Sequence, residues 1–277
     1  MGQVIHQLPE GPSVHGVTSL AGEVFLLRRK ERDQVEVYDG ITYRLQRCLT
    51  VPNIRGFGDM TSCEHYLCVY ISDHIVECIH RLDLHGASTH WPVNDRPHGL
   101  SVNRTHNLLV TFRDVCNIAE FSSHGDLIRE ITPLYDVITQ PDVINPWHAI
   151  QLTSGQYIVC HGGRDDAVHG VCMISADGRQ IVHSHGGQPG PDNDQYEVPR
   201  HLAVDAFDFV FVSDLNNSRV KLLSPTLGYI RDVVSNGLLK WKPGRLYLDT
   251  RRRHLYVTDN EWKGGKLTIG RVIVLSV

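Results

Sequence analysis

Hydrophobic residues along this chain recur in short alternating runs, and the 3.6-residue period of a helix is nearly absent. The clearest segment extends from Val198 to Val234 and contains four such runs, HLAVD, FVFVSD, RVKLLSP and GYIRDVV. Short alternating runs bounded by Gly, Asn, Asp and Ser are typical of β-strands. The pattern therefore predicts an all-β chain.

The group of four runs recurs along the chain. Similar segments begin at Val14, Arg55, Arg96, Pro146 and Lys242. When the segments are aligned on their first run, the equivalent residues are Gly16, Gly58, Gly99, His148, His201 and Arg245, with spacings of 42, 41, 49, 53 and 44 residues. Six units of four strands indicate a six-bladed β-propeller, in which each blade buries its faces against its neighbours.

The last unit is one strand short, since it reaches Val277 after three strand-like runs. The N-terminal run GQVIHQL, residues 2–8, resembles the fourth runs GDLIREI and GRQIVHS of other units. We expect this N-terminal strand to complete the last blade and to close the ring, which removes exposed sheet edges. Residues 1–277 are then a single propeller domain.

The fifth unit resembles an NHL repeat. The repeat of that family begins with a stretch rich in Gly, Asp and Asn, which is followed by an aromatic residue and the motif Pro-x-Gly-hydrophobic-Ala-Val-Asp. A strand that ends in Asp comes next, and Asn-Arg-Val follows it. The positions that match here are Gly187, Gly190, Tyr196, Pro199, Val204, Asp205, Asp214, Asn217, Arg219 and Val220. His201 stands at the usual Gly, and the unit at Lys242 matches through Pro243, Gly244, Asp249 and Asp259. The resemblance implies a propeller similar to the C-terminal one of TRIM-NHL proteins, without their RING, B-box or coiled coil.

Composition narrows the classes of function. The chain has 277 residues, 41% of them hydrophobic, seven cysteines without paired spacing and a formal net charge of −4. No apolar run reaches 18 residues and the N-terminus does not read as a signal peptide, so we expect a cytoplasmic protein with reduced thiols and no membrane partner. The net charge argues against a generally basic nucleic-acid binder.

The sequence contains none of the common catalytic or cofactor-binding motifs G-x-S-x-G, Walker A, H-E-x-x-H and C-x-x-C. No cofactor is therefore expected.

One face of the predicted propeller concentrates arginine, histidine and aromatic residues. It contains the starts of the first strands and the loops between second and third strands. The predicted ligand-binding residues are Arg28, Arg29, Arg32, Phe57, His98, Arg113, Trp147, His148, Arg164, Arg200, His201 and Arg245. The run from Arg28 to Arg32 is expected to be an exposed hairpin tip. Arginine and aromatic side chains commonly anchor peptide and single-stranded RNA ligands.

Two functions of different class follow from this face. The first is a non-enzymatic binding module or scaffold, with a peptide or protein ligand favoured by the negative net charge and single-stranded RNA as the other ligand. The second is a metal-dependent lyase or hydrolase, because His15, His98, His148 and His201 come from four different blades and neutral imidazole is a good zinc ligand. The Pro97–His98 pair is similar to one in the peptidylglycine-amidating lyases, which are NHL-like propellers.

Overall fold

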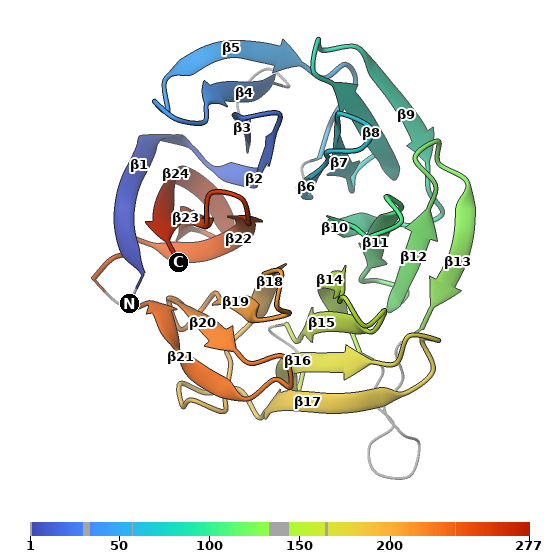
Figure 1. The fold of residues 1–277 in the computed structure, drawn as a ribbon, viewed down its shortest axis with the longest axis vertical. Helices are drawn as coiled ribbons and strands as arrows, with labels where there is room; N and C mark the ends of the chain where they lie inside the picture. Colours follow the sequence, from blue (N-terminus) through green and yellow to red (C-terminus); the bar gives the residue numbers. More distant parts are fainter. Residues whose placement is uncertain (1, 30–33, 57, 133–143, 164–165, 236) are drawn as a thin grey trace.

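The computed structural model describes residues 2–29, 34–56, 58–132, 144–163, 166–235 and 237–277. Six four-stranded antiparallel sheets are arranged as blades around a central axis (Figure 1). The described residues form no helix, so among them there is none that could span a membrane. The predicted all-β, six-bladed propeller is confirmed.

Each blade is an antiparallel meander whose first strand is innermost (Figure 1). Blades one and two contain β2 (Val14–Leu20), β3 (Glu23–Arg28), β4 (Gln34–Asp39), β5 (Leu45–Thr50), β6 (Met60–Cys63), β7 (Cys68–Asp73), β8 (Cys78–Asp83) and β9 (Ser88–Pro92). Blades three and four contain β10 (Pro97–Val102), β11 (Leu108–Phe112), β12 (Asn117–Phe121), β13 (Leu127–Ile131), β14 (Pro146–Gln151), β15 (Tyr157–His161), β16 (His169–Ile174) and β17 (Ile181–Gly187). Blades five and six contain β18 (Pro199–Val204), β19 (Val210–Asp214), β20 (Arg219–Leu223), β21 (Tyr229–Val234), β22 (Lys242–Asp249), β23 (His254–Lys263), β24 (Lys266–Ser276) and β1 (Gln3–Pro12).

The ring closes through the N-terminal strand, as predicted. β1 pairs antiparallel with β24, from Gln3 opposite Ser276 to Pro12 opposite Ile269. Leu8 of β1 is fully buried in the apolar cluster between blades six and one. The N-terminal strand therefore supplies both the outer edge of the last blade and part of its contact with the first.

The hydrophobic core is divided into six clusters, one at each interface between neighbouring blades. At the first interface, Phe25 and Val35 of blade one pack with Val69 and Ile71 of blade two. The alternating residues of each strand thus face two different neighbours. This arrangement explains why no single blade could bury its apolar residues alone.

Hydroxyl groups of second strands hold the inner strands of neighbouring blades in place. Three such hydroxyls donate to a backbone carbonyl of the following blade: Ser72 Oγ to His98 O (2.9 Å), Thr111 Oγ1 to Trp147 O (3.1 Å) and Ser213 Oγ to Gly244 O (2.8 Å). Each acceptor lies at the beginning of an inner strand. These bonds therefore fix the backbone on which the channel-mouth side chains stand.

The inner strands of five blades contain a bulge close to where they begin. In blades one, four and five the extra residue is His15, Trp147 and Arg200, respectively. A bulge breaks the regular alternation of side chains and re-aims the extra one. The bulges consequently bring the side chains of His15, Trp147 and Arg200 to one end of the channel.

All seven cysteines are free. Five of them are buried; Cys116 is half-buried and Cys48 is exposed. Burial raises the pKa of Cys160 to about 12, so this thiol stays protonated near neutral pH. The buried cysteines pack as small hydrophobic residues.

Candidate functional site

The bulged residues of the inner strands meet in a hollow at one end of the channel. Its volume is about 270 Å³. Its lining includes five residues that the sequence places at the channel mouth: His15, His98, Trp147, Arg200 and Arg245. The inner strands thus bring side chains from five blades into one site.

Positive charge dominates the lining of this hollow. Its cationic residues are Arg29, Arg200, Lys242, Arg245 and Lys266. None of the described lining residues carries a carboxylate. A concave site lined by charges of one sign concentrates ligands of the opposite sign, so the hollow is suited to an anionic group.

Trp147 supports two arginines at the wall of the hollow. The guanidinium carbons of Arg113 and Arg200 lie 3.8 Å and 3.5 Å from the centroid of its ring. The indole is only 7% exposed, and its Nε1–H donates to the carbonyl of Gly162 at 2.9 Å. Trp147 is thus a largely buried platform for arginine side chains that also lines the hollow, and its contact with a ligand stays a prediction.

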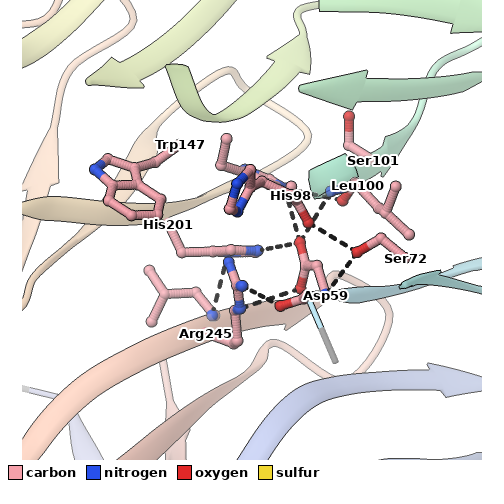
Figure 2. A network of polar contacts seen from close by, with 12 residues as sticks. Asp59, Ser72, His98, Leu100, Ser101, Trp147, His201 and Arg245 are labelled. Atoms are coloured by element: carbon pink, nitrogen blue, oxygen red, sulfur yellow. Dashed lines mark hydrogen bonds and ion pairs between the residues drawn. The ribbon is translucent and has the colours of Figure 1, made fainter. Parts of the chain in front are cut away.

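Beneath the hollow, Asp59 is the centre of a buried polar network (Figure 2). Its Oδ2 accepts a hydrogen bond from the backbone N–H of Leu100 at 2.9 Å and one from His201 Nε2 at 3.0 Å. Its Oδ1 lies 3.4 Å from Nε of Arg245. Its own backbone N–H donates to Ser72 Oγ at 2.8 Å. Asp59 therefore joins four of the six blades.

Arg245 extends this network across the channel. Its Nε donates to the carbonyl of His15 at 3.2 Å, and its Nη2 donates to that of Gly58. On the other side of the network lies a second hollow of about 240 Å³, which His148 and His201 help to line. The polar layer thus separates the two hollows and forms the floor of the cationic one.

Hydrogen bonds define the tautomers of the two stacked histidines in this layer. The N–H of Leu246 donates to Nδ1 of His201 at 3.3 Å, which places the ring proton on Nε2, facing Asp59. Nε2 of His148 donates to the carbonyl of Leu100 at 2.9 Å. Burial lowers the pKa of both histidines, and their rings stack with centroids 3.7 Å apart. Both are therefore neutral, with the proton on Nε2.

A metal ion does not fit this cluster. The ligand atoms of Asp59, His148 and His201 lie within 4.8 Å of one another. In both rings, however, Nε2 carries a proton. In His201 this proton cannot move to Nδ1, because Nδ1 already accepts a hydrogen bond from the backbone N–H of Leu246. Nε2 of His201 is therefore not free to bind a metal. The other two histidines of the four-histidine hypothesis lie elsewhere: His98 packs against Trp147, and His15 is outside the cluster. Burial and the nearby arginine charges lower the pKa of His98 to about 3.

Arg28 is not an exposed residue of a hairpin tip, contrary to the prediction. It ends β3, is 2% exposed, and its Nε lies 2.7 Å from Oε2 of Glu36. Its other guanidinium nitrogens donate to the carbonyls of Pro9, Pro12 and Gly270. Arg28 therefore ties blade one to the closing strand and is not free for a ligand.

The other predicted residues have mixed outcomes. Arg32, Phe57 and Arg164 lie outside the described residues. Arg113 is partly engaged, with Nη2 3.6 Å from Asp166 Oδ2, whereas Arg29 is exposed. His148 and His201 are in the layer beneath the hollow.

Several residues of the site were not predicted. They are Asp59, His74, Lys242, Trp262 and Lys266. Asp59 directly follows the aligned residue Gly58, so a search one position after each alignment point would have found it. Trp262 and Lys266 belong to the β23–β24 hairpin, whose length relative to other blades is the available signal.

A second buried titratable cluster lies in blade two. Sγ of Cys78 is 3.3 Å from Nε2 of His80, which is 3.7 Å from Oδ2 of Asp73. Cys78 pairs with Asp73 across the strands as Arg219 pairs with Asp214 in blade five. Asp73 accepts four backbone N–H bonds, two of them from the segment that enters its blade. The cluster is therefore a variant of a structural Asp–Arg pair.

No family model matches the chain, and no curated protein matches it. The NHL resemblance accordingly stays a prediction.

Solved structures, by contrast, match over nearly the whole chain. Virginiamycin B lyase from Staphylococcus aureus is 11% identical with a TM-score of 0.64, covering 97% of this chain and 98% of that one. Aldose sugar dehydrogenase from Streptomyces coelicolor is 14% identical with a TM-score of 0.65, covering 99% of this chain and 98% of that one. The Cps50 propeller domain from Myceliophteria thermophila is 11% identical with a TM-score of 0.63, covering 100% of both chains. They share the fold. They are a lyase, a dehydrogenase and a propeller domain, so the fold alone does not select a function.

Proposed function

We propose that this propeller is a non-enzymatic binding module that holds a peptide segment of a protein partner at the channel mouth. The observation that carries the proposal is the cationic hollow, whose described lining contains five basic side chains and no acidic one. Apolar contacts are available beside the charges, since Leu215, Trp262 and Leu267 also line it. Charges that orient a ligand next to apolar side chains that bury it are typical of peptide sites.

A peptide is favoured over single-stranded RNA for a specific reason. Base stacking needs an open aromatic face. The ring of Trp147 is buried and two guanidinium groups lie against it, so it offers no such face. Of the two tryptophans in the described lining, this leaves Trp262, which is 41% exposed, whereas single-stranded RNA sites stack successive bases on several aromatic side chains. The negative net charge of the chain points the same way.

The metal-dependent lyase or hydrolase is less well supported. Its histidines are divided between the hollow and the buried layer, and those in the layer hold their protons on Nε2. The fold similarity to virginiamycin B lyase lies at 11% identity and carries no residue across.

The test is selection from a library of random heptapeptides displayed with either terminus free. The double variant Arg29→Glu/Lys242→Glu reverses charge at the hollow. Arg251→Glu/Arg253→Glu is the matched control, because it also reverses two charges at exposed positions. Both residues lie in the turn after β22, whereas Lys242 begins that strand. We expect selected peptides to bind the wild type and the control equally and the double variant at least fivefold more weakly.

Two outcomes would contradict the proposal. One is that no peptide is selected, or that the double variant binds the selected peptides at full strength. The other is that labelled poly-uridine binds more tightly than any peptide, with an affinity that falls steeply as salt rises, as phosphate contacts require.

A further inference from the structure

The cationic hollow has a closed floor, which limits what can enter it. Arg245 spans the channel at the base of the hollow through bonds to the carbonyls of His15 and Gly58, and Asp59 lies beside Arg245 and pairs with it (Figure 2). Both side chains are more than nine-tenths buried. A polypeptide cannot thread through this layer, so the part of a ligand that reaches the floor of the hollow is a chain end or a side chain.

Positive charge above the floor lacks a counter-charge in the described structure. Asp59 is paired with Arg245, and Asp166 lies near Arg113. No described carboxylate lies within ion-pair distance of Arg200, whose guanidinium group stacks on the face of Trp147. Burial, together with the charges of Arg245 and Arg113, lowers the pKa of Arg200. The hollow therefore holds uncompensated positive charge that an anion would stabilise.

Hydrogen-bond donors are also left without acceptors at this place. Nη1 of Arg245 is buried and has no described partner, although the residue lines the hollow. A buried donor without an acceptor costs free energy, and such groups are rare in folded proteins. A guanidinium stacked on an indole, as in Arg200, keeps its N–H edges free for a planar, two-oxygen acceptor.

We propose that the hollow is a carboxylate subsite, in which Arg200 and Arg245 donate hydrogen bonds to a carboxylate of the bound ligand. This inference rests on the proposed peptide-binding function and specifies its chemistry. The carboxylate is either the C-terminus of a peptide or an Asp or Glu side chain. Lys242 at the rim adds charge, while Leu215 and Trp262 contact the neighbouring part of the ligand. An N-terminal ammonium group is repelled by the same charges.

Three synthetic peptides distinguish the sources of the carboxylate. They are Ac-Ala-Ala-Ala-Leu as the free acid, the same peptide as its C-terminal amide, and Ac-Ala-Glu-Ala-Leu amide, measured by isothermal titration calorimetry. We expect the free acid, the Glu peptide or both to bind at least tenfold more tightly than the plain amide. If only the free acid binds more tightly than the plain amide, the carboxylate is a C-terminus. If only the Glu peptide does, the carboxylate is a side chain. Equal binding of all three overturns the subsite.

Variants test whether the named donors act. Arg200→Gln should abolish the tenfold preference, Arg200→Lys should restore part of it, and Arg251→Gln on the opposite face should leave it unchanged. Melting temperatures of all variants establish that they are folded. A full preference retained in folded Arg200→Gln overturns the assignment.

Small anions test the subsite independently of any peptide. In ¹⁵N-labelled protein, the indole N–H signal of Trp147, assigned with Trp147→Phe, should shift on titration with acetate in the wild type and not in Arg200→Gln. If acetate produces this shift and no peptide binds, the subsite stands and the peptide-binding function fails. If acetate shifts neither protein, or if inorganic phosphate binds tenfold more tightly than acetate, the carboxylate subsite is wrong.

Discussion

At the scale of single residues, the site depends on which charges are compensated. Burial raises the pKa of Asp59, but the charge of Arg245 and the hydrogen bond from His201 outweigh it and hold the pKa below its usual range. The ionised carboxylate therefore neutralises Arg245 and stabilises the floor. Arg200, which stands on the indole instead of a carboxylate, keeps its charge available. The hollow thus has an ion-paired arginine at its floor and, at its wall, an arginine with no described carboxylate within ion-pair distance, so it remains electropositive.

Buried neutral histidines should make the protein sensitive to mild acid. Burial lowers the pKa of His161 to about 4, while the unfolded chain takes up this proton near pH 6.5. Between these values the unfolded state binds more protons, so the free energy of unfolding falls as pH falls, by up to about 1.4 kcal/mol per pH unit for each such group. We expect urea denaturation to show lower stability at pH 5 than at pH 7. The loss should be smaller in His161→Gln.

The matched control for this measurement is His124→Gln, at an exposed position in the β12–β13 turn. It should lose as much stability as the wild type between the two pH values. If His161→Gln and the wild type lose the same amount, His161 is not held neutral by burial.

At the scale of strands and turns, the sequence predicted the runs but not their irregularities. The alternating runs identified the strands because each blade face is buried against a neighbour. A bulge changes which side a residue faces without changing composition, so the sequence placed Trp147 at the mouth but could not show that it would be buried. Arg28 was assigned to an exposed tip because it lies between the strand-like runs EVFLL and QVEVYD; β3 instead continues to Arg28, and Glu36 across the blade compensates its charge. The hollow itself depends on contacts between blades, which no local pattern contains.

One side chain outside the inner strands is expected to be critical for joining the last blade to the first. Asn260 of β23 accepts from the N–H of Val14 at 2.8 Å and donates to its carbonyl at 2.9 Å, and it is 3% exposed. Asn260→Leu keeps the branched shape and leaves two buried backbone groups unpaired, at about 1–3 kcal/mol each. We expect the melting temperature to fall by roughly 4 °C or more.

Asn193→Leu, at an exposed loop position, makes the same chemical change and should shift the melting temperature by about 1 °C or less. Equal shifts in the two variants would show that the bonds between Asn260 and Val14 contribute nothing to closure.

At the scale of the whole molecule, every blade packs between two neighbours, and the apolar cluster that contains Leu8 joins the last blade to the first. The floor of the hollow depends on this closure, because Arg245 of the last blade bonds to carbonyls of the first two. Ring closure and site geometry are therefore coupled. The sequence predicted closure from a missing fourth strand, but the coupling required the structure.

Removal of the closing strand should test that coupling. Deleting residues 1–9 removes most of β1, including the buried Leu8, and exposes the outer edge of β24. Because the burial of one strand contributes several kcal/mol, we expect a melting temperature several degrees lower. A synthetic peptide of residues 2–9 added in trans should restore part of the loss, whereas the same peptide with Leu8→Asp should not, since a carboxylate cannot be buried in the apolar cluster. An unchanged melting temperature after deletion, or equal rescue by both peptides, would show that β1 does not close the ring in solution.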